Sequence, residues 1–159
     1  MIPERTQSPY FIYRKLDLRD PRTSEHFSGR TDMSAENEER KQKILYVQTS
    51  GVDSPVRLYT PFRLALMAVS DDVEAYIYFV GEGITVVKEG EAEKIQIGDL
   101  PPLKEVIVEA VEAGVKLLFS EESRNLHGLK RKDMYNKALP VGLITLNDLL
   151  LTTDAALTF

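Results

Sequence analysis

The sequence predicts an α/β protein: a three-layer α/β/α sandwich of the flavodoxin-like type, with a parallel sheet of about five strands. Short apolar runs alternate with helix-like patterns along residues 43–159, and glycine and proline residues separate them. Strands that follow one another through helices pair in parallel, because a parallel connection needs a long crossover. The length of 159 residues suits one domain with a tail.

The first strand and the first helix are predicted near the start of this domain. The run Lys43–Gln48 is apolar and is followed by Thr49-Ser50-Gly51, which is typical of a strand and its exit loop. The helix then begins either at Ser54-Pro55 or at Thr60-Pro61, since proline is favoured in the first turn and breaks a helix further along. Its apolar pattern continues to about Ser70.

The clearest later element is an amphipathic helix that Pro101-Pro102 opens and Gly114 closes, as expected for a helix C-cap. The other elements follow from apolar runs bounded by polar loops. In order, the sequence predicts a strand at 74–80, a short strand or helical turn at 84–87, the helix at 103–113, a strand at 115–119, a polar loop with a short helical turn at 120–132, a strand at 141–145, a helix at 146–153 and a strand at 155–159.

Residues 1–42 differ in character, and we interpret them as a polar, partly mobile N-terminal extension of the domain at 43–159. They contain no sustained apolar period, so they cannot bury enough surface to offset their ordering entropy alone. One island, Tyr10-Phe11-Ile12-Tyr13, is apolar enough to dock on a neighbour. Two interpretations stay open: a mobile tail, or an arm in which Tyr10, Phe11 and Tyr13 contact a partner.

Composition excludes several classes of function. The chain has no cysteine, which excludes disulfides, thiolate zinc sites and thiol chemistry, and its two histidines are too far apart in sequence to suggest a metal site. Residues 43–159 carry 12 basic and 17 acidic side chains, which argues against nucleic-acid or membrane binding. No apolar run is long enough to cross a bilayer, and the N-terminus lacks the apolar core of a signal peptide. We therefore expect a cytoplasmic protein with no cofactor and no metal.

Candidate site residues follow from the strand ends, because ligands of parallel sheets bind beyond the carboxyl ends of the strands. Gly81-Glu82-Gly83 lacks the third glycine of a dinucleotide loop and is predicted to be a turn. The pocket candidates are Thr49, Asp53, Ser120, Glu122, Ser123 and His127. A basic cluster of Arg124, Lys130, Arg131 and Lys132 is either a solvated face or a contact for an anion or partner.

The stretch from Leu117 to Asp133 resembles the DsrE/DsrF-like family of sulfur-relay proteins, which have the YchN-like fold. The matching positions are Ser123, Gly128-Leu129, Asp133, Val141-Gly142, Leu146 to Leu151 and Asp154-Ala155. The Thr49 to Pro61 loop and the strand EAYIYFV resemble the first half of the family, so the resemblance covers about Lys43 to Phe159. It implies a cytoplasmic homo-oligomer, either a trimer or a hexamer.

The departure from the family pattern lies at Ser120, where the family carries its persulfide cysteine. A serine hydroxyl has neither the acidity nor the polarizability to hold a second sulfur, so this chain cannot be a carrier by that mechanism. Two hypotheses remain. One is a non-catalytic structural or regulatory partner in a sulfur-trafficking assembly, beside a cysteine-bearing DsrE paralogue or a TusA-like carrier. The other is a protein, or a minor enzyme, that binds a small anion or nucleotide in the pocket.

Overall fold

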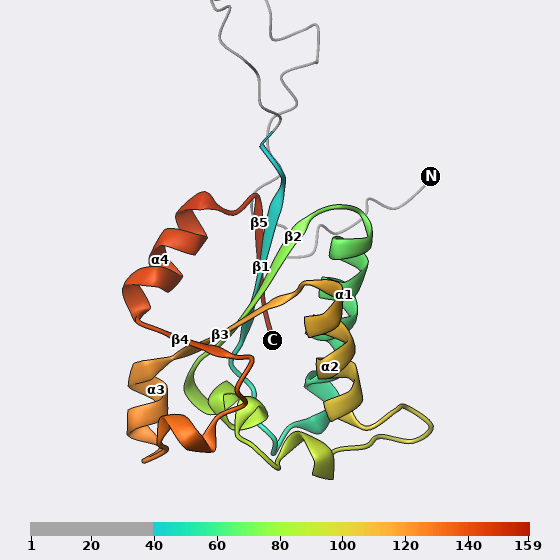
Figure 1. Ribbon diagram of the computed structural model, residues 1–159, viewed down its shortest axis with the longest axis vertical. Coiled ribbons are helices and arrows are strands. Elements are labelled where there is room, and N and C mark those ends of the chain that lie inside the picture. The colour runs from blue at the N-terminus through green and yellow to red at the C-terminus, as the bar shows by residue number, and fades with distance from the viewer. Residues whose placement is uncertain (1–39) are drawn as a thin grey trace, which may run out of the picture. The chain divides into compact units, whose positions relative to one another are not determined.

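The computed structural model describes residues 40–159, and five parallel strands form the centre of this region (Figure 1). Their order in the sheet is β4-β3-β2-β1-β5, so β4 and β5 lie at the two edges. The predicted fold class, a parallel sheet of about five strands between helices, is confirmed. The strands are β1 Lys43–Gln48, β2 Glu74–Phe79, β3 Lys116–Ser120, β4 Leu139–Val141 and β5 Ala155–Thr158.

The helices cover both faces of the sheet, as the handedness of the connections requires. From β1 to β3 the chain moves one way along the sheet, whereas the connection from β4 to β5 runs back to the opposite edge. Right-handed connections therefore place α4 on the face opposite to α1 and α2, as Figure 1 shows. The helices are α1 Tyr59–Ser70, α2 Leu103–Ala113, α3 Glu121–Leu126 and α4 Leu143–Thr152, and short 3₁₀ helices occupy Pro55–Arg57 (η2), Gly81–Val87 (η3), Ala92–Lys94 (η4) and Arg131–Asp133 (η5).

The two faces of the sheet are packed very unequally. Beneath α1 and α2 lies a large core that includes Phe62, Ile77, Ile107 and Phe119, all nearly or fully buried. On the other face, the buried hydrophobic cluster consists of Leu45, Val47, Tyr78 and Leu118, against which Leu146 and Leu149 of α4 pack. No residue of α4 is itself buried. One helix covers that face of the sheet only in part.

Several element boundaries differ from the sequence predictions. Pro61 lies in the first turn of α1, where its missing N–H needs no partner, and Pro55 starts the separate 3₁₀ helix η2. The segment 84–87 belongs to the 3₁₀ helix η3. The strand predicted at 141–145 was wrong: β4 ends at Val141, and Gly142 is the N-cap of α4. The apolar run after Gly142 suits either a strand or a helix, and periodicity cannot separate the two in so short a run.

The predictions made for residues 1–39, including those for Tyr10, Phe11 and Tyr13, lie outside the described residues. Within residues 40–159, no helix is both long and apolar enough to cross a membrane. The same part of the chain contains no group of three or more histidine or acidic side chains placed to hold a metal ion.

Candidate functional site

The connections run toward the β4 edge from β1 to β4 and then back to β5, so the topological switch point lies between β3 and β4. At the opposite edge of the sheet, β5 pairs with β1. The backbone oxygen of Phe159 lies beside the carboxyl end of β1. It accepts hydrogen bonds from the N–H groups of Thr49 (2.8 Å) and Ser50 (3.1 Å), and from the Thr49 hydroxyl (2.6 Å). The donors that could have bound an anion are therefore used by the chain itself.

The loops that follow β1 and β2 are packed tightly against each other. A Cβ on Gly83 would lie 2.0 Å from the carbonyl oxygen of Gln48, and one on Gly51 would lie 2.5 Å from that of Glu82. The Thr85 hydroxyl accepts from the N–H of Val52 (3.0 Å). The segment 81–83 thus opens a 3₁₀ helix packed against the neighbouring loop, and this close contact requires its glycine.

Two serines tie α3 to the sheet. Ser120 is fully buried at the end of β3 and is the N-cap of α3: its hydroxyl oxygen accepts from the N–H of Ser123 (3.0 Å). The Ser120 hydroxyl in turn donates to the Glu122 carboxylate (3.0 Å). The Ser123 hydroxyl oxygen accepts from the N–H of Gly81 (2.9 Å). Both side chains make structural hydrogen bonds and neither faces open solvent.

Glu122 connects this cap to the start of α4. Its other carboxylate oxygen lies 3.4 Å from the N–H of Leu143, the first residue of α4. Hydrogen bonds from its own N–H, from Ser120 and from Leu143 lower the pKa of this exposed carboxyl. A carboxylate beside the first turns of two helices is favourable, because their unpaired N–H groups carry partial positive charge.

Tyr78 is a neighbour of this group that the sequence analysis did not single out. Its hydroxyl donates to the carbonyl oxygen of Gly142 (3.4 Å). Burial raises the pKa of the phenol, a hydrogen bond with Ser120 partly offsets this, and the charge of Glu122 raises the pKa by a smaller amount. The alternation in EAYIYF puts Glu74, Tyr76 and Tyr78 on one face of β2. This alternation could have grouped the three residues from the sequence, but only the tertiary structure shows that their face of the sheet is the one that α4 covers.

The predicted pocket residues do not form one group. Thr49 and Asp53 are exposed on the loop after β1, two strands away from Ser120 on β3. His127 ends α3, and its Nε2 lies 3.7 Å from a carboxylate oxygen of Glu82. The Ser120 proton is directed to Glu122 and not to a histidine, so the structure offers no serine–histidine nucleophile there.

The four residues of the predicted basic cluster also do not act as one group. Arg124 donates to the carbonyl oxygen of Leu129 (2.9 Å), and its Nε is buried without a partner. Arg131 donates to that of Ala138 (3.1 Å) and lies over the Phe119 ring, 5.5 Å from its centroid. Lys130 and Lys132 remain exposed.

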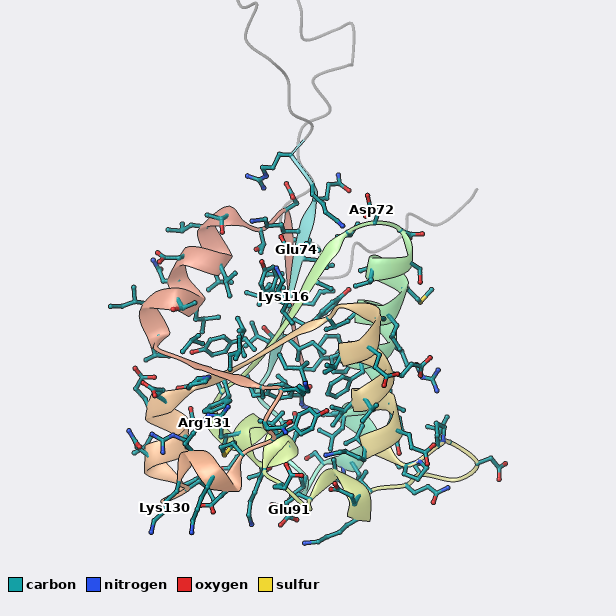
Figure 2. The ribbon with its side chains drawn as sticks, in the orientation of Figure 1. Asp72, Glu74, Glu91, Lys116, Lys130 and Arg131 are labelled. Carbon is teal, nitrogen blue, oxygen red and sulfur yellow. The ribbon has the colours of Figure 1, made fainter. Side chains whose placement is uncertain are left out.

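A second charged group lies at the opposite end of the sheet, where Figure 2 shows Glu74 and Lys116 side by side. Lys116 also lies over the Tyr76 ring, 5.0 Å from its centroid, and Lys43 lies 3.5 Å from Glu74. The hydrogen bond between Lys116 and Glu74 lowers the pKa of Glu74 and raises that of Lys116. These charges occupy the part of the sheet face near the amino ends of the strands.

The fold and this arrangement define the class of protein. Residues 42–159 match the model of the DsrE/DsrF-like family, and the chain belongs to that family. The resemblance seen in the sequence is thereby confirmed.

Among solved structures, the chain is similar to the YchN protein of E. coli, with a TM-score of 0.62 and 14% identity over 75% of this chain and 99% of that one. It is also similar to MTH1491 of Methanobacterium thermoautotrophicum, described as a protein of unknown function, with a TM-score of 0.56 and 13% identity over the same shares. At these identities the similarity shows the fold alone.

A curated relative, "Uncharacterized protein MJ0760" of Methanocaldococcus jannaschii, is 21% identical over 92 residues. These residues make up 58% of this chain and 34% of the relative, so the match spans about a third of the relative's length.

Proposed function

We propose that this chain is a non-catalytic DsrE-like subunit with a structural or regulatory role in a cytoplasmic sulfur-trafficking assembly. The observation that carries the proposal is the state of Ser120. This residue stands where the resemblance places the persulfide cysteine, it is fully buried, and its hydroxyl both caps α3 and donates to Glu122.

The chemistry of sulfur transfer supports this interpretation. A persulfide forms when a thiolate attacks a sulfur donor, and the chain has no cysteine to supply a thiolate. A serine hydroxyl could act as a different nucleophile only with an adjacent base, and its one acidic neighbour, Glu122, is held in its charged form at two helix starts as a structural group. These contacts therefore favour a structural role for Ser120 and Glu122 over a catalytic one.

The surface supports an assembly role. β5 pairs only with β1 within the described residues, and all four of its residues are exposed and uncharged. An exposed, unprotected edge strand is a surface that other chains can cover. We therefore propose that the chain forms a homo-oligomer, a trimer or a hexamer, and that a cysteine-bearing DsrE paralogue or a TusA-like carrier binds to it.

The rival proposal, binding of a small anion or nucleotide, has less support. The N–H groups of Thr49 and Ser50, and the Thr49 hydroxyl, already donate to the backbone oxygen of Phe159. A thermal-shift screen with nucleotides, phosphate and sulfur anions tests it. A ligand at 100 times its dissociation constant should add about 2.7 kcal/mol to the stability. Such a hit would favour the rival.

The test of the main proposal uses the lack of native cysteines. We expect Ser120→Cys to stay unmodified when the folded chain is treated with a persulfide donor and analysed by mass spectrometry. The matched control is Ser54→Cys, because Ser54 is exposed. If Ser120→Cys gains sulfur as fast as the control, residue 120 is accessible and the structural role assigned to it is wrong.

The partner role needs its own measurement. The full chain is mixed with the cysteine-bearing DsrE paralogue and the TusA-like carrier of its own organism, and complexes are measured by native mass spectrometry. We expect a complex with at least one of them and a change in the rate at which the paralogue passes sulfur on. No complex and an unchanged rate would contradict the assembly role.

A further inference from the structure

The outer face of α4 is an apolar stripe with no partner among the described residues. Leu143 and Leu150 are each 49% exposed, Ile144 is 81% exposed and Leu151 is 76% exposed. Only Leu146 and Leu149 of this helix pack toward the sheet. Exposed apolar side chains gathered on one helix face mark an interaction site.

The stripe is arranged symmetrically about Asn147. With 3.6 residues per turn, each residue advances by about 100°, so Leu143, Ile144, Leu150 and Leu151 all lie within about 60° of Asn147. Two apolar residues precede Asn147 by one turn and two follow it by one turn. If the helix is turned end to end about Asn147, apolar residues therefore again occupy the positions one turn before and one turn after Asn147.

The distribution of charge also favours association of this face with a second copy of the chain. Residues 139–159 contain only two charged side chains, Asp148 and Asp154, whereas residues 43–159 as a whole carry 12 basic and 17 acidic ones. Two copies of an acidic domain repel each other, so they associate best through a region almost free of charge. Asp148 lies at about 100° from Asn147, on the flank of the stripe.

We propose that α4 pairs with α4 of a second copy of this chain, antiparallel, about a two-fold axis that passes beside Asn147. Leu143 and Ile144 of one copy then face Leu150 and Leu151 of the other. The two Asn147 amides meet at the axis, where each can donate one hydrogen bond and accept one. A polar pair inside an apolar helix seam fixes the register, because any slip buries an unpaired amide.

The antiparallel direction follows from Glu122, whose carboxylate lies at the first residue of α4. A parallel pair would bring the two Glu122 carboxylates together. An antiparallel pair separates them by the length of the ten-residue helix, about 15 Å, and also sets the helix dipoles in opposition. The proposal rests on the self-association proposed above, and it favours a dimer or a hexamer over a ring of three copies, which contains no two-fold axis.

Single introduced cysteines test this pairing directly, because the chain has none of its own. Under mild oxidation we expect Asn147→Cys to form a disulfide-linked dimer. Ile144→Cys should form little, because its two copies are displaced along the seam by about 9 Å. The control is Met67→Cys, which lies on α1 and is 65% exposed. Equal, efficient dimers from Asn147→Cys and Ile144→Cys would show parallel pairing, and no excess over Met67→Cys would exclude the seam.

A disrupting variant provides the second measurement. Light scattering on the full chain gives the mass of the assembly. We expect Leu151→Arg to halve it, while Met67→Arg leaves it unchanged. Leu151 is exposed, so circular dichroism should show both variants folded. A monomeric wild type would contradict self-association as a whole. An oligomer whose mass Leu151→Arg does not alter, or a closed trimer, would overturn only the α4 pairing and leave the rest of the proposed function standing.

Discussion

Replacing Ser120 with alanine should reveal how much the buried cap contributes to stability. The change removes the oxygen that accepts from the Ser123 N–H and the proton donated to Glu122. Loss of a helix N-cap costs typically about 1 kcal/mol. The Ser123 N–H is buried and would have no acceptor, which adds to the cost. We therefore expect the free energy of unfolding to fall by about 1–2 kcal/mol.

The measurement is thermal and urea unfolding followed by circular dichroism. The full chain is used at one protein concentration, because association contributes to apparent stability. For a chain of this size, a loss of 1–2 kcal/mol corresponds to a fall in Tm of about 2–8 °C. The control is Ser54→Ala, since Ser54 is also at an N-cap but makes no side-chain cap bond. Its change should stay within about 0.5 kcal/mol. Equal, small losses in both variants would refute the reasoning that Ser120 is a structural cap.

Three further outcomes are expected. Gly83→Ala should lower the free energy of unfolding by at least about 3 kcal/mol, because the new Cβ meets main-chain atoms. Its control, Gly98→Ala, has φ +53° and open space around the new Cβ, and should cost only about 1–2 kcal/mol. Equal losses in the two variants would contradict the close contact between the loops. Glu122→Gln should reduce the loss of stability on acidification: a lowered carboxyl pKa stabilises the fold above its unfolded value of about 4.3, and this stability is lost as the pH falls through the folded pKa. Urea unfolding at pH 7 and pH 3 measures this, and an unchanged difference would count against it. Lys116→Met should cost less than about 1 kcal/mol, because its ion pair with Glu74 is half exposed; a loss above 2 kcal/mol in the same assay would show a stronger pair.

The residues of α3 show which contacts can be predicted from the local sequence and which cannot. A serine followed by two acidic residues at the end of an apolar run is typical of an N-cap, and the structure has Ser120 in that role. The same reasoning could not find Leu143 as a partner of Glu122, because 21 positions separate them and only the sheet brings them together.

The region after β3 shows a different limit. The apolar run from Val141 onward was expected to continue as a strand, but α4 begins at Leu143. Leucine and isoleucine suit both structures, and the decision depends on Gly142 and on the sheet face that Leu146 and Leu149 can reach. Once the run is a helix, its apolar residues are more than one face of the sheet can bury, which is why Leu143, Ile144 and Leu151 are exposed.

By itself, the sequence determined the α/β class, the family, and the absence of any thiol for sulfur chemistry, because these depend on composition, on local periodicity and on the order of short motifs. Only the tertiary structure decided what Ser120 does and whether the donors at the end of β1 are free. Ser120 is structural because Glu122 accepts its proton, and the Thr49 hydroxyl is occupied because Phe159, 110 positions later in the chain, accepts its hydrogen bond. Those contacts join distant parts of the chain, so the packing of the sheet, and no local pattern, determines them.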